Sequence, residues 1–295
     1  MKAMKYLKPI NEIWGPVLKR DLLGETREED KFHSEDELIE YLKSEIKKQG
    51  EHVVIQNLDA SLIEDFNYLF YGIGNGVKTL DLSGWKTSAV KDMSKMFFQC
   101  SGIESINLSG WDTSNVENMH EMFYGCKGLK SIDLSEWDTS SLVDMQYMFC
   151  YCKSLKSLDL SNWDTSSLKD AHCAFEECSS LEFIDVSTWN TEKLEDARWM
   201  FCECSKLKSI DLTKWNTSKI SGTAGMFDRC SSLESLDLSN WDTSSLMFTY
   251  EMFYKCTKLK SLNLSGWKTE MEDAGHMFHY CPAPYRVINN KIIKK

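Results

Sequence analysis

A tryptophan column that recurs every 26 residues constrains this chain more than any other feature of its sequence. Cysteine and phenylalanine columns share the period over eight copies, with the last cysteine and the last phenylalanine arriving one residue early. Three columns in register indicate a tandem array, and a period of 26 residues lies within the range of leucine-rich repeats. The column tryptophans are Trp85, Trp111, Trp137, Trp163, Trp189, Trp215, Trp241 and Trp267.

Each copy combines a strand pattern with a helix pattern. The apolar residues Ile106 and Leu108 alternate with polar ones, which is typical of a strand with one buried face. After a Ser/Thr-rich turn, Met119, Met122 and Phe123 have the spacing of one helical face. We therefore predict an α/β repeat solenoid, leucine-rich-repeat-like, with eight 26-residue strand–turn–short-helix repeats and a parallel sheet on one face.

The two ends of the array differ from its middle, as terminal repeats do. Ser34 and Glu37 form a capping box, and Gly50 is placed to end a helix over residues 34–49. A strand is expected at 52–55. The predicted regions are an N-terminal helical and strand cap with a degenerate first repeat over 1–76, the solenoid over 77–281, and a basic C-terminal tail over 282–295.

The charge balance narrows the partners. With a net charge of −11 and a pI near 5.1, the chain lacks the basic face that nucleic-acid phosphates or an anionic membrane require. A basic protein partner, or mimicry of nucleic acid, is compatible with this charge. No apolar stretch is long enough to span a membrane. Charges are scattered through the first 20 residues without the apolar core of a signal peptide, which predicts a cytoplasmic protein.

The repeat resembles a known family. The segment Met122-Phe123-x-x-Cys126-x-x-Leu129, followed by Ser-Ile-Asp-Leu-Ser, resembles the BspA-like leucine-rich-repeat proteins. The Trp-Asp-Thr-Ser run resembles their bacterial surface-protein subclass, and the resemblance covers residues 77–281. It implies a surface or secreted adhesion or binding module without catalytic residues. No leader, lipidation cysteine or sorting signal accompanies it, so cytoplasmic and surface locations both stay open.

The tryptophan and cysteine columns are predicted to be structural core. The tryptophans take the position where ordinary leucine-rich repeats keep an inward asparagine, which favours a buried stack over a sugar-binding platform. Cysteines that repeat in register match small buried thiols better than disulfides. The additional Cys150, Cys173 and Cys202 do not form the CxxC pairs of zinc sites, so we predict no metal and no cofactor. The core cysteines include Cys126, Cys152, Cys178 and Cys204.

The outward strand positions form the candidate binding face. Aspartate occupies the outward position in most copies, beside a serine column and a mixed lysine and glutamate column. This face is a solvated surface, a binding face for a basic or hydrogen-bonding partner, or a calcium ladder. Phe183 replaces serine at mid-face and is either an aromatic anchor or an isolated exposed ring. The candidate binding residues are Asp133, Asp159, Phe183, Asp185, Asp211 and Asp237.

The sequence contains no motif that indicates catalysis. It has no glycine-rich phosphate loop and no HExxH, and its six histidines share no repeat column, so we predict that it is not an enzyme. The leading hypothesis is a scaffold for protein–protein interaction through the acidic strand face. A surface or secreted adhesin or glycan-binding protein is the first alternative, and an acidic decoy that mimics DNA is the second. We expect a protein partner, with a glycan as the other option and no direct nucleic-acid binding.

Overall fold

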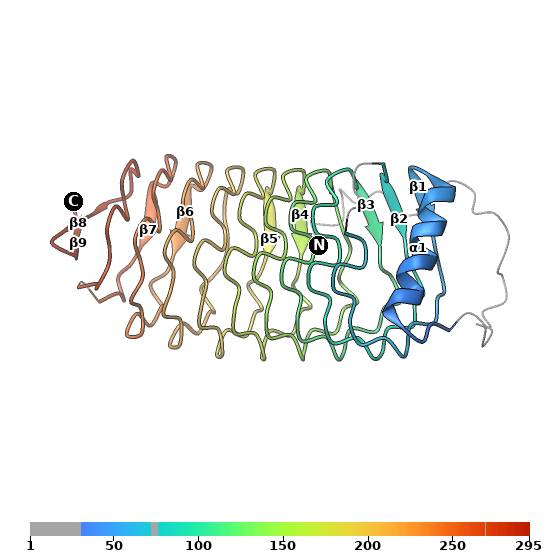
Figure 1. The fold of residues 1–295 in the computed structure, drawn as a ribbon. Helices are drawn as coiled ribbons and strands as arrows, with labels where there is room; N and C mark the ends of the chain where they lie inside the picture. The colour runs from blue at the N-terminus through green and yellow to red at the C-terminus, as the bar shows by residue number, and fades with distance from the viewer. Residues whose placement is uncertain (1–30, 72–75, 269) are drawn as a thin grey trace.

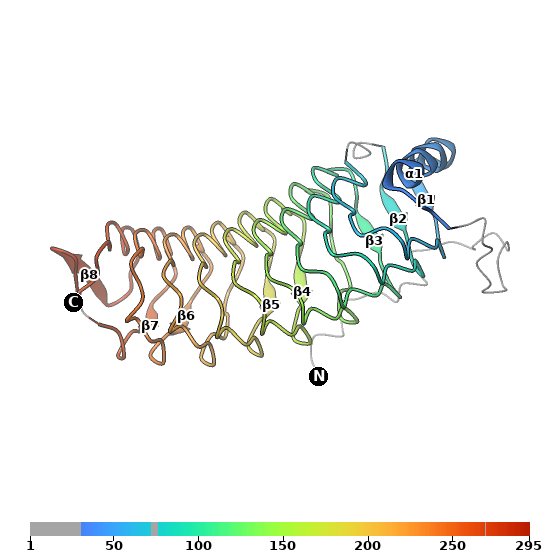
Figure 2. The same ribbon diagram turned by 60° about the horizontal axis from the view of Figure 1, so that its bottom comes forward.

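The computed structural model describes residues 31–71, 76–268 and 270–295, which form one elongated solenoid (Figure 1). Each turn of the solenoid, here called a rung, is one 26-residue repeat, and successive rungs lie side by side (Figure 2). The predicted leucine-rich-repeat-like fold, with parallel strands stacked on one face, is confirmed. The first 30 residues of the predicted N-terminal cap lie outside the described residues.

One face of the solenoid carries strands of three residues each. In most of them the central residue is buried and its neighbours are not, because successive side chains of a strand point to opposite faces. The parallel strands are β1 (His52–Val54), β2 (Thr79–Asp81) and β3 (Ser105–Asn107) in one sheet, β4 (Ser157–Asp159) with β5 (Phe183–Asp185), and β6 (Ser235–Asp237) with β7 (Ser261–Asn263).

A second ladder of backbone pairing runs along another side of the solenoid. Asp92 pairs with Asn118, Asn118 pairs with Asp144, and the bridges continue from rung to rung as far as Asp273. The polar side chain at this position also shapes its own rung, since Asp144 Oδ1 accepts a hydrogen bond from the Gln146 N–H at 2.8 Å. Such Asx turns fix the corners that carry Asp or Asn, whereas the ladder also joins the two rungs that carry Gly222 and Phe248 at this position.

The prediction of a short helix in each repeat is wrong, because the segment that follows this ladder is a run of consecutive turns. Alternate N–H groups leave the rung: Glu121 donates to the Gln146 carbonyl and Phe123 to the Met148 carbonyl of the next repeat. The N–H groups between them close turns onto carbonyls three residues earlier. Glu121 and Gly125 have φ angles of +54° and +72°, which no α-helix contains. The helix-like spacing therefore marks the inward side chains of turns that bond to a neighbouring rung.

The N-terminal end is covered by the α-helix that the capping box predicted. In α1 (Glu35–Gln49), the Ser34 side chain accepts from the Glu37 N–H, and Gly50 at φ +73° ends the helix. Leu38 is fully buried against the first rung. Within the described ranges, no helix has the length and the apolar content needed to cross a membrane.

The segment predicted as a basic tail closes the other end. It folds into an antiparallel hairpin of β8 (Tyr285–Ile288) and β9 (Lys291–Lys294), joined by two asparagines with positive φ. Ile292 is buried, and the Tyr285 ring packs on Phe278 with 6.0 Å between ring centroids. The alternating apolar residues of this segment thus shield the last rung from solvent.

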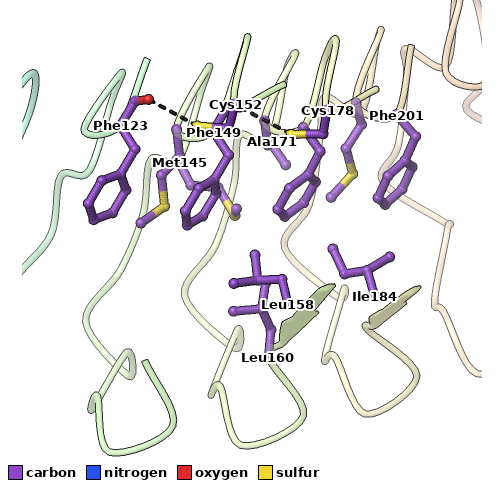
Figure 3. Packing of buried hydrophobic residues seen from close by; sticks show 14 of the residues in the cluster. Phe123, Met145, Phe149, Cys152, Leu158, Leu160, Ala171, Cys178, Ile184 and Phe201 are labelled. Carbon is purple, nitrogen blue, oxygen red and sulfur yellow. Dashed lines mark hydrogen bonds between the residues drawn. The ribbon is translucent and has the colours of Figure 1, made fainter. Parts of the chain in front are cut away.

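The interior is built from ladders of identical side chains (Figure 3). Phe123 and Phe149 stack with their ring centroids 5.1 Å apart and their planes at 11°. Beside them, the Cys152 thiol donates to the Phe123 carbonyl and the Cys178 thiol to the Phe149 carbonyl, both at 3.2 Å. Inward strand residues such as Leu158 fill the opposite side of the core.

Candidate functional site

The tryptophan column lies in the core. Its eight members have exposed fractions of 1 to 7%. The Trp111 indole N–H donates to the Leu82 carbonyl of the preceding repeat at 2.8 Å, and the same bond recurs along most of the column. Trp137 departs from this pattern, because its buried Nε1 has no hydrogen-bond partner among the described residues. Buried rings of this kind offer no face to a ligand.

The cysteine column is also buried and its thiols are free, as are the three cysteines outside the column. Burial raises the pKa of the Cys126 and Cys152 thiols well above its usual value, so they stay protonated and act as hydrogen-bond donors. Cys178 and Cys204 make the same bond to a phenylalanine carbonyl 29 residues earlier. Over the described part of the chain, no group of three or more candidate ligands is arranged to hold a metal ion.

The predicted aspartates form a row along the strand face, and each is held by its own turn. Asp159 Oδ1 accepts from the Ser161 N–H at 3.0 Å and from the Ser161 hydroxyl at 2.7 Å. The hydroxyl and N–H of Thr213 bind Asp211 in the same way and lower the pKa of its carboxyl. Equivalent turns hold Asp133, Asp185 and Asp237.

These turns fix the direction of the carboxylates. In Asp133, Asp159, Asp185 and Asp211 the hydrogen bonds within the described residues all end on Oδ1, so Oδ2 keeps its capacity to accept. The strands are parallel and in register, and Asp159 lies directly beside Asp185. The arrangement is a row of oriented acceptors repeated once per rung.

Phe183 interrupts the polar face in β5. It is paired in register with Ser157, and its side chain is 44% exposed. The neighbouring column contains Glu182 and lysines such as Lys156, and further toward the N-terminus Lys130 is paired with Glu104. An exposed ring among charged groups can add apolar contact to an otherwise polar surface.

A second row of carboxylates, which the sequence analysis did not single out, runs beside the first. It consists of Asp112, Asp138 and Asp164 from the Trp-Asp-Thr-Ser runs. Asp138 Oδ1 accepts from the N–H and the hydroxyl of Ser140 at 3.0 and 2.7 Å, and these bonds lower the pKa of the Asp138 carboxyl. The Asp-x-Ser spacing, present at both corners of the repeats that contain Asp133, Asp159 and Asp237, was the signal for both rows.

The turn side of the N-terminal rungs carries a string of aromatic rings that was also missed. Tyr68 and Tyr71 contact Phe98, which stacks on Tyr124 at 5.0 Å, and Tyr124 meets Tyr151 edge to face at 5.5 Å. Phe98 and Tyr124 share a repeat position that the next three copies fill with Cys150, Glu176 and Cys202, so a column-by-column comparison would have revealed these rings.

One buried cluster has the residue types of a nucleophilic site. Cys173 Sγ lies 3.4 Å from His172 Nε2, and His172 Nδ1 lies 3.9 Å from Asp196. Burial raises the pKa of the Cys173 thiol and lowers that of His172, while Nε2 also lies 2.9 Å from the Tyr147 hydroxyl. Both shifts favour the neutral pair over the thiolate that a nucleophilic cysteine needs.

Solved structures with similar folds share little sequence with this chain, and no curated protein sequence matches it. TLR13 in complex with ssRNA13 is 20% identical over 79% of this chain, with a TM-score of 0.39, and the match spans only 30% of TLR13. A leucine-rich-repeat protein of T. pallidum is 18% identical, covering 79% of this chain and 82% of its own, with a TM-score of 0.36. A leucine-rich cell surface protein of Faecalibacterium prausnitzii is 15% identical, covering 76% and 87%, with a TM-score of 0.20.

A protein family defined by sequence matches most of the repeat array. Four overlapping matches cover residues 42–132, 64–183, 99–210 and 170–291, which together amount to well over half of the chain. On this evidence the chain belongs to the family described as "Mycoplasma protein of unknown function, DUF285".

Proposed function

We propose that this protein is a non-catalytic binding scaffold that holds a basic segment of a protein partner against its strand face. The observation that carries the proposal is the row of carboxylates held by Asx turns, in which each Oδ1 is used internally while Oδ2 keeps its acceptor capacity. Orientation that exists before binding lowers the entropic cost of the complex.

The electrostatics of the row favour a cationic partner. Carboxylates in successive rungs lie roughly 5 Å apart, and each such pair repels by about 1 kcal/mol in water. An arginine or lysine placed between two of them removes this repulsion and forms charge-assisted hydrogen bonds. The second row at Asp112, Asp138 and Asp164 widens the acidic surface on one side.

The lysines on the same face favour a scaffold for a protein partner over an acidic decoy that mimics DNA. Lys156 and Lys208 alternate with Glu182 and Glu234 in the column next to the aspartates, so the face does not present a uniform phosphate-like field. A partner that fits it carries both basic and acidic side chains. A binding role also agrees with the resemblance to the BspA-like proteins.

The test uses substitutions that the fold already accommodates. Asn107 and Asn263 occupy the aspartate column and make the same turns through their Oδ1 atoms. Aspartate-to-asparagine changes therefore remove charge and keep the turn. The binding variant carries this change at Asp133, Asp159, Asp185 and Asp211. The control variant carries glutamate-to-glutamine changes at exposed sites elsewhere, namely Glu64, Glu117, Glu195 and Glu272.

Binding is measured by fluorescence anisotropy with a labelled peptide of alternating arginine and glycine, at several salt concentrations. We expect the asparagine variant to bind at least about tenfold more weakly than wild type, and the glutamine variant to bind nearly as well as wild type. Equal losses in the two variants would show that the peptide responds only to net charge, and the strand face would then have no special role.

A further inference from the structure

A shallow pocket of about 370 Å³ opens on the turn side of the solenoid, away from the acidic strand face. It extends over three successive rungs of the N-terminal half. Its volume lies within the range of small-ligand sites. Its lining residues are Gln99, Ser101, Tyr124, Gly125, Lys127 and Tyr151.

The hollow exists because one repeat position lacks a side chain. Gln99, Gly125 and Tyr151 occupy the same position in consecutive repeats, and all three have positive φ, at +57°, +72° and +63°. Later copies place Glu177 and Glu203 there, at +55° and +58°. The backbone conformation of this column therefore does not require glycine. A side chain at Gly125 would contact Gln99, so its absence enlarges the pocket beside Gln99.

Two aromatic rings form one wall of the pocket. Tyr124 and Tyr151 meet at an interplanar angle of 63°, and Phe98 stacks on Tyr124 from the neighbouring rung. The Lys153 ammonium lies 5.3 Å from the centre of the Tyr151 ring. An inclined pair of rings leaves no parallel slot for a flat base, but it can take the C–H groups on one face of a saturated ring.

The six residues that line the pocket include one cation, Lys127, while the carboxylates of Glu176 and Glu177 lie outside the lining and, together with burial as the main cause, raise the pKa of Tyr151. None of the six lining residues carries a carboxylate, although the net charge of the chain is −11. Lys127 is exposed, and no ion pair engages it within the described residues. Gln99 and Ser101 contribute amide and hydroxyl groups that suit a ligand rich in hydroxyls.

We propose that this pocket binds an acidic monosaccharide unit, a pyranose ring that packs on Tyr124 and Tyr151, directs its acidic group to Lys127 and reaches Gln99 and Ser101 with its hydroxyls. The site is separate from the strand face, so a glycan and a protein segment can be held at the same time. Sugar binding at this pocket does not require the basic-peptide partner.

The test uses methyl β-glucuronide, its neutral counterpart methyl β-glucoside, AMP and inorganic phosphate as probes of the full chain, with saturation-transfer NMR and titration. We expect the glucuronide to bind about tenfold more tightly than the glucoside, which is the ratio that about 1.4 kcal/mol produces. Lys127→Ser, which introduces the residue that Ser101 provides one repeat earlier, should remove this difference. Gly125→Gln, which copies Gln99, should fill the hollow and abolish binding of both sugars.

Glu203→Gln, in the same column but away from the pocket, is the matched control and should bind like wild type, and circular dichroism checks that each variant is folded. Four results would overturn the proposal: no binding of either sugar, equal binding of the two, glucuronide binding that survives Gly125→Gln, or competition by phosphate or AMP as strong as by the glucuronide itself. Should Gly125→Gln fail to fold, the comparison of the two sugars on Lys127→Ser still decides the question.

Discussion

Replacing Trp111 by phenylalanine should destabilise the solenoid more than the same change at Trp137. The two side chains are equally buried, each with 5% of its surface exposed, and both substitutions remove the same atoms. The transfer and cavity contributions to the free energy of unfolding therefore largely cancel in the comparison. What remains is the indole N–H, which in Trp111 donates to the Leu82 carbonyl at 2.8 Å and in Trp137 has no acceptor among the described residues.

The magnitude follows from this one difference. Trp111→Phe removes a buried hydrogen bond and leaves the Leu82 carbonyl without that donor, which together cost about 2 kcal/mol. Trp137→Phe removes a buried donor that is already unpaired, so it carries no such penalty. Trp111 also stacks on Trp85 at 5.5 Å, which adds to the difference in the same direction. We expect Trp111→Phe to lower the free energy of unfolding by about 2 kcal/mol more than Trp137→Phe.

Urea unfolding of both variants, followed by far-ultraviolet circular dichroism and by tryptophan fluorescence, measures this difference. Repeat proteins can unfold in segments, so the two signals must change together before a single free energy is assigned. The reasoning is refuted if Trp137→Phe proves as destabilising as Trp111→Phe, because the indole bond would then contribute nothing to the array.

Four further outcomes are expected. Asp159→Ala should lower stability by about 1 kcal/mol by removing the acceptor of the Ser161 turn, whereas Asp159→Asn should leave the melting temperature nearly unchanged. Burial raises the pKa of Asp228 to about 6, so between about pH 4 and pH 6 the folded state keeps a proton on this carboxyl that the unfolded chain has lost. The contribution of Asp228 to the free energy of unfolding should therefore fall as pH rises through this range, by on the order of 1 kcal/mol. Asp228→Asn should reduce that slope in denaturation curves without removing it, since the pKa of Asp170 is raised to about 6 as well. The eleven buried thiols should react slowly with a thiol-specific dye in the native protein and all react once it is unfolded; a fast native thiol would contradict their burial. Deleting residues 285–295 should expose Phe278 and the last rung, lower the melting temperature and cause self-association detectable by size-exclusion chromatography.

The architecture could be predicted from the sequence because the same pattern of apolar and polar residues recurs in eight copies, so each copy supports the same interpretation. The strand alternation around Ile106 and the capping box at Ser34 are local signals, and the structure contains both elements. The helix expected around Met122 is absent for a non-local reason. Its alternate N–H groups bond to the next rung, and that option exists only once the copies are stacked. Spacing within one copy cannot distinguish these two hydrogen-bonding patterns.

Of the strand-face row and the pocket, the one that repeats from copy to copy was predicted, and the one that depends on a single copy was not. The row containing Asp159 was visible because it repeats. Its internal bonds to Ser161 and its equivalents give the aspartates a structural role that column position alone did not indicate. The pocket at Gly125 was missed because it arises where one copy departs from the column, and its walls come from residues 26 positions away on either side.

The rung-to-rung bonding of the turn segment also bears on how such a gene changes over time. Each rung offers its neighbour the same set of donors and acceptors, so recombination that adds or removes one whole 26-residue unit joins two edges that already fit. A change of any other length has to be absorbed within one rung, as in the last copy, where Phe253 and Phe278 lie 25 residues apart and still stack. The helix-covered start and the hairpin-covered end are then inherited intact, while the number of rungs between them, and with it the separation of the surface features they carry, varies in single steps.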